Sequence, residues 1–195
     1  MRSAEVSRNT SETSVELVLD LDRVGQVTVQ TGCGFLDHML TSMAVHGSAS
    51  LQVRASGDIQ VDYHHLVEDV GILLGDALGK CLGEKQGLAR FGSAIVPMDE
   101  SLCLVALDLS GRPYLSVEGL PSLLRVGDFD VDLIPEFLRA FSNRSAVTLH
   151  VRFLNFGNAH HAIEAMFKGI GLALSQASRY DDRVTGVKSV KGRLS

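Results

Sequence analysis

Apolar and polar residues alternate in two long stretches of the chain that share one pattern. Segment 14–29 (SVELVLDLDRVGQVTV) and segment 101–117 (SLCLVALDLSGRPYLSV) each predict a strand, a turn and a second strand, because alternation with a period of two is typical of half-buried strands. The turns are predicted at 22–25 and 110–113. LVLDL in the first stretch corresponds to VALDL in the second, which indicates an internal repeat.

The segments that follow each stretch also correspond in pairs. Apolar residues recur at helical spacing in four of them, and two shorter segments between them alternate like strands. The two helices that come last, 64–82 and 160–178, are the most similar pair, and both contain small residues suited to close packing. We therefore expect helices at 35–47, 64–82, 134–144 and 160–178, and strands at 48–55 and 146–153.

Each half of the chain thus has the predicted order β-β-α-β-α, with a linking segment near residues 83–100. One half alone covers only one face of its sheet. Two halves that pack helix against helix would form an α+β fold, an α/β sandwich with one shared core. We predict a single domain over residues 1–195, made of pseudo-symmetric halves at about 1–90 and 91–195.

The two most similar helices both begin with the motif HHxxE. Residues i and i+4 lie on the same face of a helix, so the first histidine and the glutamate of each motif can bind one metal ion. The second histidine points about 100° further round the helix and can reach a neighbouring ion. Two such motifs predict a dinuclear site with imidazole and carboxylate ligands. Its residues are His64, His65, Glu68, His160, His161 and Glu164.

The ligand types narrow the choice of metal. Neither motif contains a cysteine, and mixed imidazole and carboxylate ligands suit Mn, Fe, Co, Ni or Zn. The other histidines of the chain, His38, His46 and His150, could supply a further imidazole to each ion and a contact to the substrate. As an alternative, His46 lies just before Gly47 and could simply terminate a helix.

Composition excludes several classes of protein. The chain has 195 residues, 45% of them hydrophobic, and a formal charge of -5, which argues against a dedicated nucleic-acid binder. No apolar run reaches the roughly 18 residues of a membrane span, and the N-terminus lacks the apolar region of a signal peptide. Three widely spaced cysteines suggest reduced thiols. We expect a cytoplasmic protein that binds neither nucleic acid nor membrane.

Several basic residues are candidates for binding a phosphate. Arg90 and Arg112 lie in predicted turns, where a guanidinium can bind phosphate with two hydrogen bonds, although ordinary solvated arginines are the alternative. Lys168 follows Glu164 by four residues and should share its helix face. The C-terminal segment 187–192 offers ammonium, hydroxyl and backbone N–H groups, or is only a frayed end.

Several motifs follow one another in an order that is typical of a known family. They are RNTSET (8–13), TGCGFLDHML (31–40), HG (46–47), DYHHLVEDVGILLGDAL (62–78), RFGSAIVPMDES (90–101), DLSGRPYL (108–115), NAHHAIEAMFKGIGLAL (158–174) and SVKG (189–192). Together they resemble the imidazoleglycerol-phosphate dehydratase family, and the resemblance covers nearly the whole chain. Two positions differ from the family pattern: Leu66 replaces a frequent Thr, and the Gly two residues before Asn158 is missing.

The resemblance implies a ribosomal protein S5 domain 2-like fold and two Mn(II) ions per active site. It implies that one ion is bound by His64, Glu68, His150 and His161, and the other by His38, His65, His160 and Glu164. It places Glu12 and His46 at the substrate as catalytic residues. It places Arg90, Arg112, Lys168, Ser189 and Lys191 around the substrate phosphate. Similar proteins form homo-oligomeric shells of 24 subunits built from trimers, in which neighbouring subunits share each site.

The reaction that the resemblance implies is a dehydration in histidine biosynthesis. A lyase of this kind converts D-erythro-imidazole glycerol phosphate, a phosphorylated imidazole, into imidazole acetol phosphate. Two alternatives use the same metal ligands. A dinuclear hydrolase would activate water against a phosphorylated small molecule. A shell protein whose subunits are joined by metal ions, or a metal-storage protein, would catalyse no reaction and would hold more than two ions per chain.

Overall fold

The structure, a computed structural model, describes residues 1–192, so the last three residues of the predicted domain lie outside it. The first half contains β1 (Ser3–Asn9), β2 (Thr13–Asp20), β3 (Val27–Gln30), α1 (Gly34–His46), β4 (Ser50–Gly57) and α2 (His64–Leu82). The second half contains β5 (Phe91–Met98), β6 (Ser101–Asp108), β7 (Tyr114–Glu118), β8 (Arg125–Val126), β9 (Phe129–Asp130), α3 (Leu133–Ser145), β10 (Thr148–Asn155) and α4 (Ala159–Ser178).

The two halves repeat one sheet topology. The strand order is β1-β2-β4-β3 in the first sheet and β5-β6-β10-β7 in the second. In both sheets the third strand of the half lies parallel to the strand that follows the next helix, β3 beside β4 and β7 beside β10. This arrangement confirms the internal duplication that the repeated sequence pattern predicts.

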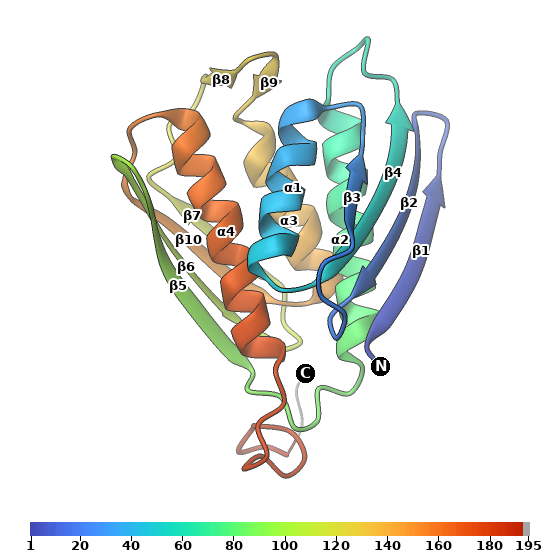
Figure 1. The fold of residues 1–195 in the computed structure, drawn as a ribbon, viewed down its shortest axis with the longest axis vertical. Coiled ribbons are helices and arrows are strands. Elements are labelled where there is room, and N and C mark those ends of the chain that lie inside the picture. The colour runs from blue at the N-terminus through green and yellow to red at the C-terminus, as the bar shows by residue number, and fades with distance from the viewer. Residues whose placement is uncertain (193–195) are drawn as a thin grey trace.

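The helices form the middle of the molecule. Figure 1 shows the two sheets as outer layers, with the four helices of the described chain between them. Helix α2 packs against α3, and α1 packs against α4, so each contact joins the two halves. Buried apolar residues of both halves form one hydrophobic cluster. The predicted α+β sandwich, with helix packed on helix, is therefore confirmed.

Small residues allow the helices to approach closely, as the sequence suggests. A Cβ added to Gly171 of α4 would lie 2.2 Å from the carbonyl oxygen of Met43 in α1. A Cβ on Gly75 of α2 would lie 2.7 Å from the carbonyl oxygen of Phe141 in α3. Backbone atoms cannot move away from such a contact, so these glycines are required by the helix packing.

Each half also contains a first strand that the sequence pattern does not predict. Strand β1 lies in the polar N-terminal segment, and β5 lies in the expected linking segment 83–100. Both are edge strands, and β1 buries only Ala4 and Val6. In β5 apolar residues lie on both faces: Val96 and Met98 pack against the core, whereas Phe91 and Ile95 are exposed. Neither strand therefore shows the alternation of apolar and polar residues that would reveal it.

Among the helices of residues 1–192, none combines the length and the apolar composition that a membrane crossing requires.

Candidate active site

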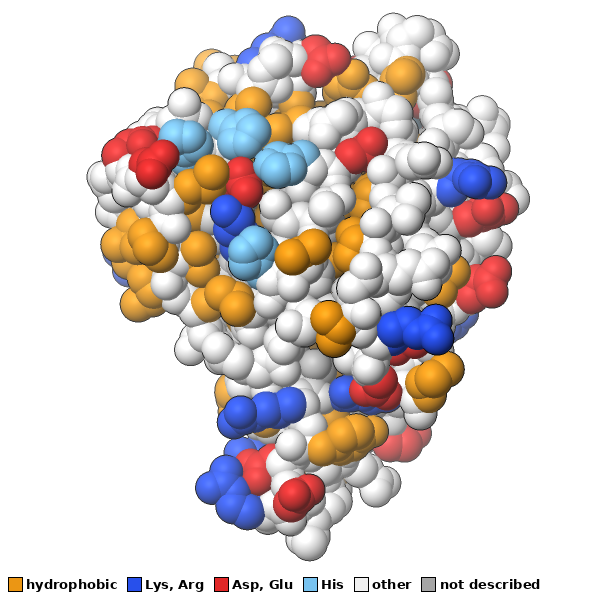
Figure 2. All heavy atoms as spheres, viewed as in Figure 1, with side chains coloured by type: hydrophobic (Ala, Val, Ile, Leu, Met, Phe, Trp, Pro, Cys, Tyr) orange, Lys and Arg blue, Asp and Glu red, His pale blue; other side chains and the backbone are white. Residues whose placement is uncertain are grey.

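Two histidines and a glutamate meet where α1 packs against α4. The Nε2 atom of His38 in α1 lies 3.2 Å from Oε2 of Glu164 in α4, and Nε2 of His160 lies 3.3 Å from the same oxygen. The ligand atoms of the three residues all lie within 4.8 Å of one another. Figure 2 shows several histidine side chains gathered on this face of the molecule. We call His38, His160 and Glu164 the α1–α4 cluster.

The carboxylate of Glu164 is buried but strongly stabilised as an anion. Nζ of Lys168 lies 2.9 Å from Oε1 of Glu164, and Oγ of Ser42 lies 3.4 Å from the same oxygen. Burial by itself raises the pKa of Glu164, but the hydrogen bonds from Lys168 and His38 outweigh it and lower the pKa to about 2. Glu164 is therefore ionised near neutral pH, as a metal ligand must be. Lys168 shares its helix face, as the sequence predicts.

The first HHxxE motif opens helix α2 and meets two carboxylates from nearby loops. Nδ1 of His65 lies 3.0 Å from Oδ2 of Asp58, which follows β4. Nε2 of His65 lies 3.8 Å from Oε1 of Glu12, in the turn between β1 and β2. The hydrogen bond to Asp58 raises the pKa of His65. The rings of His64 and His65 are 6.0 Å apart, and Glu68 is exposed on the same helix.

The second histidine of the other motif also has a carboxylate partner. Nδ1 of His161 lies 3.3 Å from both carboxylate oxygens of Glu100 and 3.7 Å from Oδ2 of Asp99, in the turn between β5 and β6. The backbone N–H of Asn158 donates to Glu100 and is the main reason that the pKa of Glu100 falls to about 2. Glu100 is therefore ionised near neutral pH.

His150 lies apart from the helix motifs. Its neighbours in β10, Leu149 and Val151, are buried toward the helices, whereas His150 is exposed on the opposite face of the second sheet. Its ring lies 5.5 Å from that of Tyr114. Within one chain, the second sheet therefore separates His150 from the helix-borne residues of the ligand set implied for the first ion.

His46 is the last residue of α1. Its Nδ1 lies 2.8 Å from the carbonyl oxygen of Ser42, one turn earlier in the helix. The N–H of Gly47 bonds to the carbonyl of Met43 at 2.8 Å. His46 therefore does help to terminate the helix, and its exposed Nε2 edge remains available to a ligand.

Arg90 lies far from the α1–α4 cluster. Its guanidinium bonds to both carboxylate oxygens of Asp108, at 2.7 and 2.9 Å, and to the carbonyl oxygen of Lys188 at 2.6 Å. Its backbone N–H donates to the carbonyl of Ala177 near the end of α4. Glu164 precedes Ala177 by 13 residues of this helix, or roughly 20 Å at 1.5 Å per residue. One small substrate cannot contact Arg90 and this cluster in the same chain.

The other predicted phosphate ligands divide between the same two ends of α4. The β6–β7 turn holds Arg112, whose backbone N–H lies 3.1 Å from Oγ of Ser110. The segment that leads into this turn is held beside Arg90, since the backbone N–H of Leu109 donates to the carbonyl of Arg90 at 3.0 Å. Ser189 follows Lys188, which contacts Arg90, and Oγ of Ser189 accepts the N–H of Lys191 at 3.2 Å. Lys168, by contrast, lies beside Glu164.

Sequence reasoning missed the carboxylates that contact the predicted residues. Asp58, Asp99 and Glu100 face the second histidines, and Asp108 faces Arg90. Three of the four lie in loops or turns, where no periodicity marks a side chain's direction. The signal nearest to them was their position in the matching stretches, since Asp99 and Glu100 lie inside 90–101 and Asp108 begins 108–115.

The two positions that differ from the family pattern, the glycine before Asn158 and Leu66, lie in different surroundings. Gly157 lies against Glu100, because an added Cβ would be 2.2 Å from Cγ of Glu100. A glycine directly before Asn158 therefore leaves space for the carboxylate that contacts His161. Leu66 is 1% exposed and belongs to the hydrophobic core rather than to the site surface.

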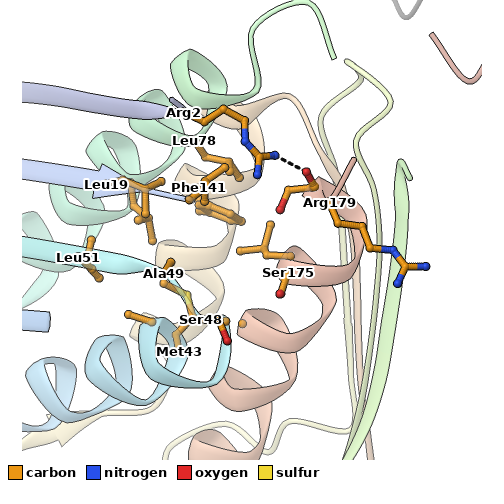
Figure 3. Close-up of a pocket in the computed structure, with 17 residues that line it drawn as sticks. Arg2, Leu19, Met43, Ser48, Ala49, Leu51, Leu78, Phe141, Ser175 and Arg179 are labelled. Carbon is orange, nitrogen blue, oxygen red and sulfur yellow. Dashed lines mark hydrogen bonds between the residues drawn. The ribbon is translucent and has the colours of Figure 1, made fainter. Parts of the chain in front are cut away.

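An apolar cavity of about 190 Å³ lies between the first sheet and the C-terminal half of α4. Figure 3 shows Leu19, Leu51 and Phe141 among its walls, with Arg2 at the rim donating to the carbonyl of Ser178. Of the residues described, no histidine lines this cavity. Apolar walls do not suit a phosphorylated substrate, so the histidine groups are the better candidate site.

Comparisons with known proteins agree on one family. The model of the family described as imidazoleglycerol-phosphate dehydratase matches residues 31–174. A relative of that name from Acetivibrio thermocellus is 51% identical over 193 residues, covering 99% of each chain. Another from Bacillus cereus is 52% identical over 194 residues, covering 100% of each chain.

Two solved structures are similar in fold as well. The crystal structure of imidazoleglycerol-phosphate dehydratase from Staphylococcus aureus subsp. aureus N315 has a TM-score of 0.83 and 37% identity, covering 92% of this chain and 99% of that one. The structure from Pyrococcus furiosus, in complex with (S)-C348, has a TM-score of 0.84 and 37% identity, covering 97% and 100% of the two chains.

Proposed function

This chain belongs to the imidazoleglycerol-phosphate dehydratase family, and from that premise we propose a two-metal active site that neighbouring copies of the chain complete together. The enzyme dehydrates imidazole glycerol phosphate in histidine biosynthesis and is a carbon–oxygen lyase. The names of its relatives favour this reaction over the hydrolase and storage alternatives.

The observation that carries the metal site is the α1–α4 cluster. Two imidazole nitrogens and an ionised carboxylate within 4.8 Å of one another fit a divalent ion such as Mn(II). We propose two Mn(II) ions per active site. A bound ion would act as a Lewis acid that stabilises negative charge developing on the substrate. The proposed ligands are His38, His65, His160 and Glu164 for one ion, and His64, Glu68, His150 and His161 for the other.

The separation of these ligands supports a shared site. His150 lies on the outer face of the second sheet, away from the helices that carry the other ligands. Arg90 lies roughly 20 Å along α4 from Glu164. A site that contains all of them therefore needs residues from more than one copy. This requirement supports a homo-oligomer, for which the resemblance suggests 24 subunits built from trimers.

The outer faces of the two sheets differ in a way that favours self-association through the second sheet. Strands β5 and β7 expose Ile95 and Tyr114, at 61% and 57% of their full exposure, on the face that carries His150. The corresponding face of the first sheet carries Glu16 and Arg54. Apolar side chains on an outer sheet face are typical of surfaces that another chain covers.

The remaining residues bind and act on the substrate in this proposal. The phosphate is held by Arg90, Arg112, Lys168, Ser189 and Lys191, which orients the imidazole end. Glu12 has a half-exposed carboxylate and transfers a proton as general acid and base. His46 contacts the substrate through its exposed ring edge, since its Nδ1 is occupied by the carbonyl of Ser42.

We also propose that the chain acts as one domain in the cytoplasm. Its core is continuous across both halves. Cys33, Cys81 and Cys103 are buried thiols, which suits a reducing compartment.

A direct assay tests the function. The purified protein should convert imidazole glycerol phosphate to imidazole acetol phosphate without releasing inorganic phosphate, and metal analysis should find two ions per chain. Phosphate release would favour the hydrolase, and a larger number of ions without turnover would favour storage.

Mixing two inactive variants tests the shared site. His38→Ala removes a metal ligand and Arg90→Ala removes a phosphate ligand, so each variant alone should have little activity. If neighbouring copies supply the two residues, co-expression at equal amounts should restore about one quarter of the sites, since equivalent copies assemble at random.

The matched control is a co-expressed mixture of the single variants His38→Ala and Glu164→Gln. Both residues belong to the α1–α4 cluster of one chain, so no mixed assembly contains an intact cluster. Recovery of activity in the first mixture but not in the second supports a shared site. Failure of the first mixture, with assembled protein present, would refute it.

A further inference from the structure

The second histidine of each HHxxE motif contacts a carboxylate through its Nδ1 atom. In the first half, Nδ1 of His65 lies 3.0 Å from Oδ2 of Asp58. In the second half, Nδ1 of His161 lies 3.3 Å from both carboxylate oxygens of Glu100. Asp58 follows β4 and Glu100 lies between β5 and β6, so each carboxylate comes from a loop beside the histidine's helix.

This contact selects one form of each imidazole. An ionised carboxylate can only accept hydrogen bonds, so Nδ1 must carry a proton and donate it. In the neutral ring the free lone pair is then on Nε2, on the other side of the ring. Histidines that bind a metal commonly donate their other N–H to a carboxylate, which fixes the ring and makes the ligand nitrogen more basic.

Contacts within the same chain hold the carboxylate of Glu100 and the backbone of Asp58 in place. Oε1 of Glu100 accepts the N–H of Asn158 at 2.6 Å and lies 3.3 Å from Oγ of Ser101. The N–H of Asp58 donates to the carbonyl of Glu12 at 3.1 Å, and the carbonyl of Asp58 accepts the N–H of Val61 at 2.8 Å. Contacts within the protein therefore fix the loops that carry Asp58 and Glu100.

Glu12 provides a contrast within the duplicated fold. The β1–β2 turn that carries Glu12 corresponds to the β5–β6 turn that carries Glu100. Glu12 lies 3.8 Å from Nε2 of His65, whereas Glu100 lies at Nδ1 of His161. Equivalent turns thus place Glu12 at the Nε2 side of one imidazole ring and Glu100 at the Nδ1 side of the other.

We infer that Asp58 and Glu100 are positioning residues, which hold His65 and His161 with Nε2 facing the metal ions. The inference rests on the proposed two-metal site. Asp58 and Glu100 bind neither metal nor substrate in this scheme; they act through the histidine that each contacts.

Mn(II) affinity tests the inference. Asp58→Leu and Glu100→Leu remove the acceptor, whereas Asp58→Asn and Glu100→Gln keep an oxygen acceptor without the charge. We expect the dissociation constant of Mn(II), measured by competition with a chelator on the assembled enzyme, to rise about 100-fold in the Leu variants and about tenfold in the amide variants. Glu84→Leu, which replaces an exposed carboxylate after α2, is the matched control and should not change it.

The thermal unfolding midpoint of the metal-free protein separates positioning from a merely structural role. A structural role would lower that midpoint and leave the Mn(II) affinity of the folded protein unchanged. Unchanged Mn(II) affinity in the folded Leu variants would overturn the inference, and the amide variants decide in the same way if a Leu variant does not fold. If the unaltered enzyme binds no Mn(II), the proposed metal site fails instead.

Discussion

Removal of metal with a strong chelator is expected to abolish dehydration of imidazole glycerol phosphate, and added Mn(II) is expected to restore it. The physical reason lies in the α1–α4 cluster. Glu164 is buried yet ionised, with its pKa lowered to about 2, and two imidazole nitrogens lie within 3.3 Å of its Oε2 atom. Such a group is suited to a divalent cation, which would supply a Lewis acid to the reaction when bound.

The experiment requires activity and metal content from the same samples. Mg(II), a cation that prefers oxygen ligands, serves as a control and should restore less activity than Mn(II). Chelation should also reduce the assembly size in light scattering if ions join ligands from different copies. Full activity in a preparation shown to be free of metal would contradict the two-metal proposal.

Replacement of Glu12 by Gln is expected to reduce turnover by about 10²- to 10⁴-fold while metal content stays at two ions per chain. Gln has nearly the same shape as Glu but cannot exchange a proton near neutral pH. The variant therefore removes acid–base chemistry and leaves the metal ligands unchanged. Turnover and metal analysis on the same preparation measure both effects.

The turn that carries Glu12 should keep its shape in this variant. Oγ1 of Thr10 accepts the N–H of Glu12 at 3.1 Å and that of Thr13 at 3.0 Å. Asp69, on α2, anchors both sides of the turn through a hydrogen bond from Thr13 and an ion pair with Arg8 at 2.7 Å. None of these contacts uses the carboxylate of Glu12.

Glu16→Gln is the matched control for this prediction, because Glu16 is an exposed glutamate of the adjoining strand β2. It should retain normal turnover. Unchanged turnover in Glu12→Gln would remove Glu12 from the mechanism, and loss of metal in that variant would assign it a structural role instead.

The sequence predicts well whatever depends on local periodicity. The four helices and the i, i+4 contact between His160 and Glu164 follow from helical spacing, and that contact is present at 3.3 Å. The strands β1 and β5 do not follow, because β1 buries few apolar side chains and β5 carries apolar residues on both faces, so neither alternates clearly. Similarity of the two halves predicts the sandwich, since each half leaves one surface to cover.

The candidate site depends on contacts that local sequence patterns do not predict. His38 joins Glu164 across 126 residues only because α1 packs against α4. Asp58 and Glu100 reach their histidines from loops, whose conformation depends on neighbouring backbone contacts rather than on periodicity. The same holds for Arg90 and Lys168, which the resemblance groups together and which α4 separates within one chain.

The sequence by itself therefore determined the helices, the strands of the repeated pattern, the duplication and the chemical types of the candidate ligand residues, because each depends on residue identity and short-range spacing. The tertiary structure decided which predicted ligand residues meet in one chain and which carboxylates contact the second histidines. It also decided that His150 and Arg90 lie away from the α1–α4 cluster of the same chain. Those outcomes depend on helix packing and on the face of the sheet to which a side chain points. Both are set by contacts between residues distant in the chain.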